Sequence, residues 1–180
     1  MVEAYIGIGS NLGDRGDNIC HALNLIAPKL KIACISSVFE TEPEGYKEQP
    51  DFLNAVIKLE EVCVSARELL RFLKSIESNL GRKEDFRNAP RIVDLDILFY
   101  GDVIIEEDDL TIPHPRLHER SFVLIPLTEI AGELVHPCLH NNIEELLSKL
   151  KTVGRISKVG NCQYDISRKE YVFNLNRAKF

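Results

Sequence analysis

The chain has 180 residues, a formal net charge of −6 and 44% hydrophobic residues, so it is long enough to bury a core without disulfides or metal ions. The negative charge argues against general nucleic-acid binding, and no apolar run approaches the roughly 20 residues of a membrane span. The N-terminus lacks a basic region followed by an apolar signal core, and the five scattered cysteines favour reduced thiols. We therefore expect a cytoplasmic protein with one domain over residues 1–150 and a tail over 151–180, which the sequence does not place.

Hydrophobic periodicity divides the first hundred residues into strands and helices. Apolar residues alternate in the strands and recur every three or four positions in the helices. The second helix begins with a capping box, Ser65 and Glu68, and ends at Gly81. In chain order, the sequence predicts a strand at 4–9, a helix at 16–27, a strand at 31–39, a loop at 40–51, a strand at 52–60, a helix at 66–80, a loop at 82–91 and a strand within 90–100.

This order of elements predicts an α+β fold, the ferredoxin-like βαββαβ arrangement with an antiparallel sheet. Its helices would cover one face of the sheet, and the active site would lie on the other. The apolar residues of the last strand are expected on the helix-covered face: Val93, Leu95, Ile97 and Phe99. A small hairpin is expected at 103–105 and 110–112, followed by C-terminal helices at about 118–131 and 142–150.

Two carboxylates, Asp94 and Asp96, share the opposite face of the last strand. They would lie roughly 7 Å apart along the strand and repel each other unless a cation sits between them. Oxygen ligands of this kind suit Mg²⁺, and Arg91 just upstream suits a phosphate group. The alternative is that the two carboxylates form only a solvated face of an edge strand.

Two polar loops and one histidine are further candidates for function. The loop at 40–51 is rich in Pro and Gly and too long for a simple connection between strands. The loop at 82–91 carries three arginines directly into the strand of Asp94 and Asp96. His114 is held between two prolines, which restrict the backbone on both sides.

Several motifs resemble those of the 6-hydroxymethyl-7,8-dihydropterin pyrophosphokinase family of folate biosynthesis. The resemblance covers residues 4 to about 150 and is most specific in two blocks, Ala-Pro-Arg-Ile-Val-Asp-Leu-Asp-Ile-Leu at 89–98 and Pro-His-Pro-Arg-Leu-His-Glu-Arg-Ser-Phe-Val-Leu-Ile-Pro-Leu at 113–127. It implies transfer of the β,γ-pyrophosphoryl group of ATP to the hydroxymethyl oxygen of the pterin, with release of AMP. It also implies a monomer, with possible association with neighbouring folate enzymes.

The resemblance assigns roles to residues by position. Asp94 and Asp96 would bind two Mg²⁺ ions, and Arg82 and Arg91 would stabilise charge on the transferred group. The implied ATP-binding residues are Lys74, Glu77, Ile97, Thr111, His114 and Arg120. The implied pterin-binding residues are Thr41, Gly45, Phe52, Asn54 and Phe122, with the two phenylalanines on either side of the ring.

The chain also departs from the family pattern. Many relatives have Trp-Gly where this chain has Asn88-Ala89, and residues 151–180 exceed the usual family length. Two other functions remain open. One is a different nucleotidyl- or phosphoryltransferase with an Asp-x-Asp pair, which the ATP product (AMP or pyrophosphate) would distinguish. The other is a non-catalytic ligand-binding module, which would leave the arginines at 82, 91 and 120 without a role.

Overall fold

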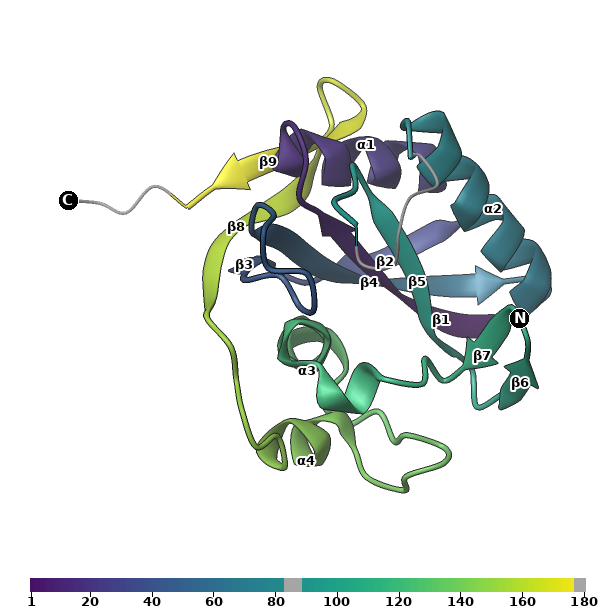
Figure 1. Ribbon diagram of the computed structural model, residues 1–180. Coiled ribbons are helices and arrows are strands. Elements are labelled where there is room, and N and C mark those ends of the chain that lie inside the picture. Colours follow the sequence, from purple (N-terminus) through teal and green to yellow (C-terminus); the bar gives the residue numbers. More distant parts are fainter. Residues whose placement is uncertain (83–88, 177–180) are drawn as a thin grey trace.

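The computed structural model describes residues 1–82 and 89–176, in which an antiparallel sheet lies between two pairs of helices (Figure 1). The predicted mixed fold with an antiparallel sheet is confirmed. The elements in chain order are β1 (Val2–Ser10), α1 (Arg15–Ile26), β2 (Lys31–Ile35), β3 (Val38–Thr41), β4 (Phe52–Val62), α2 (Ala66–Asn79), β5 (Asp94–Tyr100), β6 (Ile105–Glu107), β7 (Leu110–Ile112), the 3₁₀ turn η1 (Leu117–Glu119), α3 (Ser121–Ala131), α4 (Ile143–Ser148), β8 (Ile156–Asp165) and β9 (Glu170–Leu175).

The main sheet has seven strands in the order β5-β1-β4-β3-β8-β9, and β2 pairs with β4 alongside β3. Strands β6 and β7 form a separate hairpin; β7 has the predicted bounds, whereas β6 begins two residues after the predicted 103–105. The short connections and the capping residues follow the sequence closely. Ser65 and Glu68 form the predicted capping box of α2, and Asp14 caps α1 by accepting a hydrogen bond from the Asp17 amide.

The two faces of the sheet bury separate hydrophobic clusters. Helices α1 and α2 cover one face, where Ile6 and Ile57 are fully buried, while α3 and α4 cover part of the other face, where Leu124 and Leu127 are buried. The covering of the second face is incomplete. The part of it left open between α3 and the loop at 42–51 holds the pocket described below.

The position predicted for Phe99 was wrong. Val93, Leu95 and Ile97 lie on the α1–α2 face as expected, but Phe99 joins the cluster on the opposite face. The register of β1 and β5 shifts between Tyr5 and Ile6, which pair with Phe99 and Ile97. This irregularity breaks the strict alternation of side chains, because an extra residue in one strand turns those beyond it to the other face.

The predicted strand at 31–39 is divided into β2 and β3 at Ser36 and Ser37. The Ser36 hydroxyl is buried, donates to the Ser37 carbonyl and accepts from the Val56 amide. The Ser37 amide donates to the Glu129 carboxylate on α3. Side-chain hydrogen bonds therefore interrupt the regular ladder here, although the Ser36 amide still donates to the Val56 carbonyl, and hydrophobic periodicity does not reveal this break.

The predicted helix at 118–131 is divided at Arg120, which lies between η1 and α3 in an extended conformation (φ −112°, ψ 107°). The predicted helix at 142–150 is α4, whose N-terminus has a capping box formed by Asn142 and Glu145. The loop predicted at 82–91 lies largely outside the described residues, as does Asn88. Of the helices in the described ranges, none has the length and apolar character needed to cross a bilayer.

Residues 156–175, for which the sequence made no prediction, form the hairpin β8–β9 and extend the main sheet beyond β3 (Figure 1). The hairpin packs on α1 through Phe173, whose ring lies against Gly16 and Gly160. Cys162 on β8 lies beside Cys20 on α1, and both are free thiols in the buried cluster. The division of the chain at residue 150 stays a prediction.

The contact between α1 and the hairpin requires glycine at position 16. A Cβ atom there would lie 2.3 Å from Phe173 Cδ1, so Gly16→Ala should lower the free energy of unfolding by about 1–3 kcal/mol. Urea denaturation of the wild type and the variant measures this difference.

The matched background for this test is Phe173→Ala, which removes the ring. There, Gly16→Ala should be neutral or stabilising, because alanine is the better helix former by up to about 1 kcal/mol. An equal loss of stability in both backgrounds would show that the Phe173 ring is not the cause.

Candidate active site

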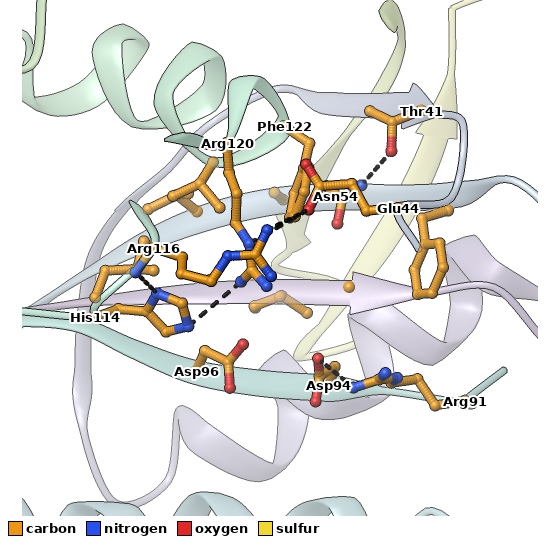
Figure 2. A pocket seen from close by; sticks show the side chains of 18 of the residues that line it. Thr41, Glu44, Asn54, Arg91, Asp94, Asp96, His114, Arg116, Arg120 and Phe122 are labelled. Carbon is orange, nitrogen blue, oxygen red and sulfur yellow. Dashed lines mark hydrogen bonds and ion pairs between the residues drawn. The ribbon is translucent and has the colours of Figure 1, made fainter. Parts of the chain in front are cut away.

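A pocket of about 310 Å³ opens on the part of the sheet that α3 leaves uncovered. Strands β1, β4 and β5 form its floor, α3 and the segment before it form one wall, and the loop at 42–51 forms another (Figure 2). Gly7 and Gly9 on β1 leave the centre of the floor without side chains. At Gly9, a Cβ atom would lie only 3.1 Å from Asn54 Oδ1, so a larger residue would crowd this side chain. The volume suits a small ligand or part of a larger one.

Asp94 and Asp96 both point into this pocket from β5 (Figure 2). Asp94 forms ion pairs through both oxygens, with Arg82 Nη1 at 2.7 Å from Oδ1 and Arg91 Nη1 at 2.8 Å from Oδ2. Asp96 has a weaker contact, with Lys74 Nζ 4.0 Å from its Oδ1. The two carboxylates predicted from the strand pattern therefore lie together, but their charges are compensated unequally.

The pKa values of the two carboxyl groups shift in opposite directions. Burial favours the neutral form of Asp94, but the charges of Arg91, Lys74 and Arg82 outweigh it and lower the pKa. Desolvation in the pocket, followed by the charge of Asp94, raises the pKa of Asp96 to about 6. The excess negative charge at Asp96 is what a bound cation would compensate.

Glu77 supports this arrangement from below the floor. Its side chain is 1% exposed; Oε1 accepts from the Leu95 amide at 2.6 Å and from Lys74 Nζ at 2.8 Å. Its Oε2 lies 2.5 Å from Arg82 Nη1. One buried carboxylate of α2 thus holds the backbone between the two aspartates and orients both Lys74 and Arg82.

A second cationic group faces the aspartates from the wall of the pocket. Arg120 Nη1 lies 3.3 Å from His114 Nε2, and Arg120 Nε lies 3.5 Å from Glu44 Oε2 (Figure 2). This Nε is buried, and within the described residues it forms the ion pair with Glu44 but no hydrogen bond. Burial, followed by the charge of Arg120, lowers the pKa of His114 to about 4, so the imidazole is neutral at pH 7.

Four uncharged side chains, those of Thr41, Phe52, Asn54 and Phe122, line what we call the neutral end of the pocket. Asn54 Nδ2 donates to Thr41 Oγ1 at 2.8 Å, and the Asn54 side chain lies in the floor. Phe52 and Phe122 line this end from β4 and α3, and Phe122 lies 5.5 Å from the Arg120 guanidinium carbon. An amide with flanking aromatic side chains can bind and orient a flat polar ring.

The pocket brings together most of the residues predicted from the sequence. Its lining includes Thr41, Gly45, Phe52, Asn54, Lys74, Arg82, Arg91, Asp94, Asp96, His114, Arg120 and Phe122. Three predicted ATP-binding residues lie outside the lining. Glu77 is buried beneath β5, Ile97 belongs to the core on the α1–α2 face, and Thr111 lies on the β6–β7 hairpin opposite Glu106. The roles of all these residues stay predictions.

Sequence reasoning did not single out Glu44 and Arg116, which also line the pocket. Glu44 lies in the loop at 42–51, and its carboxylate is 3.8 Å from Arg116 Nη2. Arg116 stands inside the Pro-His-Pro-Arg block, so its proximity to His114 was the available signal. No comparable signal marked Glu44, since its contact with Arg116 spans distant parts of the chain.

Asn11 is a further residue that the sequence analysis did not single out, and it connects two segments that border the site. Its side chain is almost fully buried, with Oδ1 accepting from the Arg91 amide at 2.7 Å. Its Nδ2 donates to Gln49 Oε1 at 2.9 Å and to the Pro50 carbonyl at 3.1 Å. Asn11 thus holds the segment carrying Arg91 next to the loop at 42–51.

The comparison with known families agrees with this geometry. A family model described as 7,8-dihydro-6-hydroxymethylpterin-pyrophosphokinase (HPPK) matches residues 5–132. The chain belongs to the HPPK family. The matched range includes every strand and helix that forms the floor and walls of the pocket, but it ends before α4, β8 and β9.

Relatives include both short and long proteins. The chain is 39% identical over 145 residues to the 2-amino-4-hydroxy-6-hydroxymethyldihydropteridine pyrophosphokinase of Aquifex aeolicus, covering 81% of this chain and 90% of the relative. It is 40% identical over 155 residues to the Folic acid synthesis protein FOL1 of Dictyostelium discoideum, covering 86% of this chain. The chain spans only 23% of that relative's length.

Solved structures support the fold. The wild-type HPPK-DHPS of Plasmodium falciparum, solved with pteroate, superposes with a TM-score of 0.67 at 19% identity. The match covers 82% of this chain and 42% of the Plasmodium chain. At this identity the likeness establishes the arrangement of strands and helices, and the HPPK assignment rests on the sequence comparisons.

The position of Asn11 leads to a stability prediction. Asn11→Ala would remove a buried side chain and leave the partly buried Arg91 amide and the Pro50 carbonyl without this partner, so unfolding should require about 1–3 kcal/mol less free energy. The denaturation midpoint in urea checks this value. Asn174→Ala, an exposed site with one long hydrogen bond of 3.4 Å, serves as the control and should change stability by less than about 0.5 kcal/mol. Equal effects of the two changes would contradict the bridging role of Asn11.

Proposed function

We propose that this protein transfers the β,γ-pyrophosphoryl group of ATP to 6-hydroxymethyl-7,8-dihydropterin, giving the pterin diphosphate and AMP, in folate biosynthesis. One observation carries the proposal: a single pocket joins an aspartate pair surrounded by cationic groups to a neutral end with an amide and two phenylalanines. These two ends match the chemistry of a polyphosphate and of a flat heterocycle. Membership of the HPPK family supports the same assignment.

The cationic groups suit the triphosphate of ATP. Asp94 orients Arg82 and Arg91, whose guanidinium groups would stabilise the negative charge that develops on the transferred group. Arg120 presents a buried Nε donor that a phosphate oxygen would satisfy, and neutral His114 beside it adds a further hydrogen-bonding nitrogen. These residues position reactants and stabilise charge, which is most of what phosphoryl-type transfer requires from a protein.

The donor set of Asp94 and Asp96 fits Mg²⁺. Both are carboxylates on one face, and the charges of Lys74 and Arg120 offset that of Asp96 only in part, since its pKa remains raised. In residues 1–82 and 89–176, no larger cluster of metal-binding side chains occurs. Proteins usually supply one or two carboxylate ligands to Mg²⁺, and water and substrate phosphates supply the others. We therefore propose Asp94 and Asp96 as the residues that hold two Mg²⁺ ions. Bound there, Mg²⁺ would neutralise phosphate charge.

The neutral end of the pocket suits the pterin. Phe52 and Phe122 would contact the faces of the ring, and Asn54, oriented by Thr41, would bond its polar edge. The hydroxymethyl oxygen would then face the aspartates. In the transfer, this oxygen forms a bond to the β-phosphorus of ATP, the bond from that phosphorus to the α,β-bridging oxygen breaks, and the hydroxyl proton is released.

The order of the strands also supports the finer prediction of a ferredoxin-like core. Among the strands expected from the sequence, β5, β1, β4 and β3 are neighbours in that order, with α1 and α2 on one face. An association with other folate enzymes is supported by relatives with names such as "Folate synthesis bifunctional protein", of which this chain covers only a part. The monomeric state and the cytoplasmic location stay predictions.

The direct test is the product of ATP. AMP should form only when ATP, Mg²⁺ and 6-hydroxymethyl-7,8-dihydropterin are all present, and chromatography of the nucleotides measures it. Each omission of one component is a control. Release of ADP or of free pyrophosphate in place of AMP would indicate a different transferase, and a lack of any ATP turnover would favour a binding module.

Asp96→Asn tests the metal assignment. The side chain keeps its volume and lies in the pocket and not in the core, so the metal-free variant should melt at the wild-type temperature or slightly above it, because a like-charge repulsion is removed. Turnover should fall on the order of a hundredfold or more, as for other groups that stabilise charge in such reactions. Rates across a Mg²⁺ titration and thermal unfolding without metal check both expectations.

The matched control is Asp108→Asn, which removes the same charge from an exposed position on the β6–β7 turn and should leave both measurements unchanged. Near-normal turnover of Asp96→Asn at the wild-type Mg²⁺ optimum would reject Asp96 as a ligand. A large loss of metal-free stability would assign the residue to the fold instead.

A further inference from the structure

The loop at 42–51, which forms one wall of the pocket, is held at both ends by one residue outside the family match. That residue is Arg155, in the segment leading into β8. The loop begins directly after Thr41 and ends directly before Phe52, and both of these residues line the neutral end of the pocket. Contacts with Arg155 therefore bear on the part of the site that we have assigned to the pterin.

At the start of the loop, the contacts involve the backbone of Arg155. The Glu42 amide donates to the Arg155 carbonyl at 3.3 Å, and the Arg155 amide donates to Glu42 Oε1 at 3.3 Å. Gly154 allows this approach, because a Cβ atom there would lie 2.8 Å from Glu42 Oε1. The antiparallel pairing of β3 with β8, in which Thr41 faces Ile156, is thus continued by one more residue into the loop.

At the end of the loop, the contact involves the Arg155 side chain. Its Nη2 lies 2.7 Å from Asp51 Oδ2, and the Asp51 carbonyl also accepts from Arg15 Nη1 at 2.8 Å. Arg15 in turn pairs with Glu40 on β3 at 2.8 Å. Asp51 is therefore restrained by two arginines immediately before the chain enters β4 with Phe52.

We propose that Arg155 is a positioning residue that, with the β8–β9 hairpin, holds the loop at 42–51 in the conformation that receives the pterin. The inference rests on the proposed function. By joining Glu42 to Asp51, Arg155 reduces the freedom of both loop ends before the substrate arrives. Less ordering is then left to occur on binding, so the apparent affinity for the pterin is higher.

The exposure of the Arg155–Asp51 ion pair predicts which kinetic and stability parameters a substitution changes. The Arg155 side chain is 68% exposed and Asp51 24% exposed, so the ion pair is weak and contributes little to global stability. Its effect falls on the local equilibrium of the loop. A substitution should therefore change pterin binding while leaving the melting temperature, kcat and the KM for ATP almost unchanged.

Steady-state kinetics of Arg155→Ala test this pattern. The KM for the pterin should rise about twofold to fivefold, the range of exposed ion pairs, with less than a twofold change in kcat and in the KM for ATP. Arg155→Lys should restore most of the difference, since it keeps the charge. Arg168→Ala is the matched control, because Arg168 is equally exposed and pairs with Asp165 at the far end of the hairpin. A KM for the pterin that is unchanged in Arg155→Ala, or raised equally in Arg168→Ala, would overturn the proposal.

A second measurement does not depend on the reaction. Hydrogen exchange of the ligand-free protein should be faster for the amides of residues 42–52 in Arg155→Ala than in the wild type or in Arg168→Ala. If the wild type forms no AMP, the proposed function fails, and faster exchange still supports the positioning of the loop. Exchange rates that are equal in all three proteins would overturn the positioning role whatever the reaction.

The partner of Arg155 provides the last test. Asp51→Asn removes the charge that Arg155 contacts but does not line the pocket itself. Combined with Arg155→Ala, it should raise the KM for the pterin no further than either single change, because both disrupt one interaction. Multiplicative effects in the double variant would show that Arg155 acts by another route and overturn the proposed contact.

Discussion

The repulsion between Asp94 and Asp96 is the constraint on which the rest of the site depends, because cationic side chains must compensate it. Alternation along β5 places both carboxylates on the pocket side of the sheet, where desolvation increases the cost of uncompensated charge. Arg82 and Arg91 neutralise Asp94, whereas the charges of Lys74 and Arg120 offset that of Asp96 only in part. The site therefore carries a localised excess of negative charge within a cationic ring, which is the electrostatic pattern that a metal–polyphosphate complex complements.

The fold supplies the compensating groups from elements that are far apart in sequence. Glu77, on the buried side of α2, fixes Lys74, Arg82 and the backbone at Leu95. On the opposite wall, the extended conformation at Arg120 ends one helical turn and starts α3, which directs its guanidinium toward the floor. Glu77 lies on the α1–α2 side of the sheet, but its carboxylate is paired with Lys74 and Arg82, so no unpaired charge is buried there.

The β8–β9 hairpin shows how a segment outside the family match can become part of the same sheet. Without it, β3 would be an edge strand of the sheet, with Thr41 at its open end. The hairpin pairs with β3, packs Phe173 into the space left by Gly16, and brings Arg155 to the loop at 42–51. The end of the pocket that we propose for the pterin thus adjoins packing between the first helix and the last strands of the chain.

Local patterns in the sequence determined the strands and helices around the site, the two aspartates on one face and, through the capping box of Ser65 and Glu68, where α2 begins. Each of these features depends on residues close together in the sequence, so hydrophobic periodicity and capping rules predict them. The tertiary structure alone decided the shift that moves Phe99, the role of Asn11, the contacts of Glu44 and the place of residues 156–175. Each of these depends on hydrogen bonds, ion pairs or side-chain packing between segments distant in sequence, and such contacts leave no periodic signal in either segment.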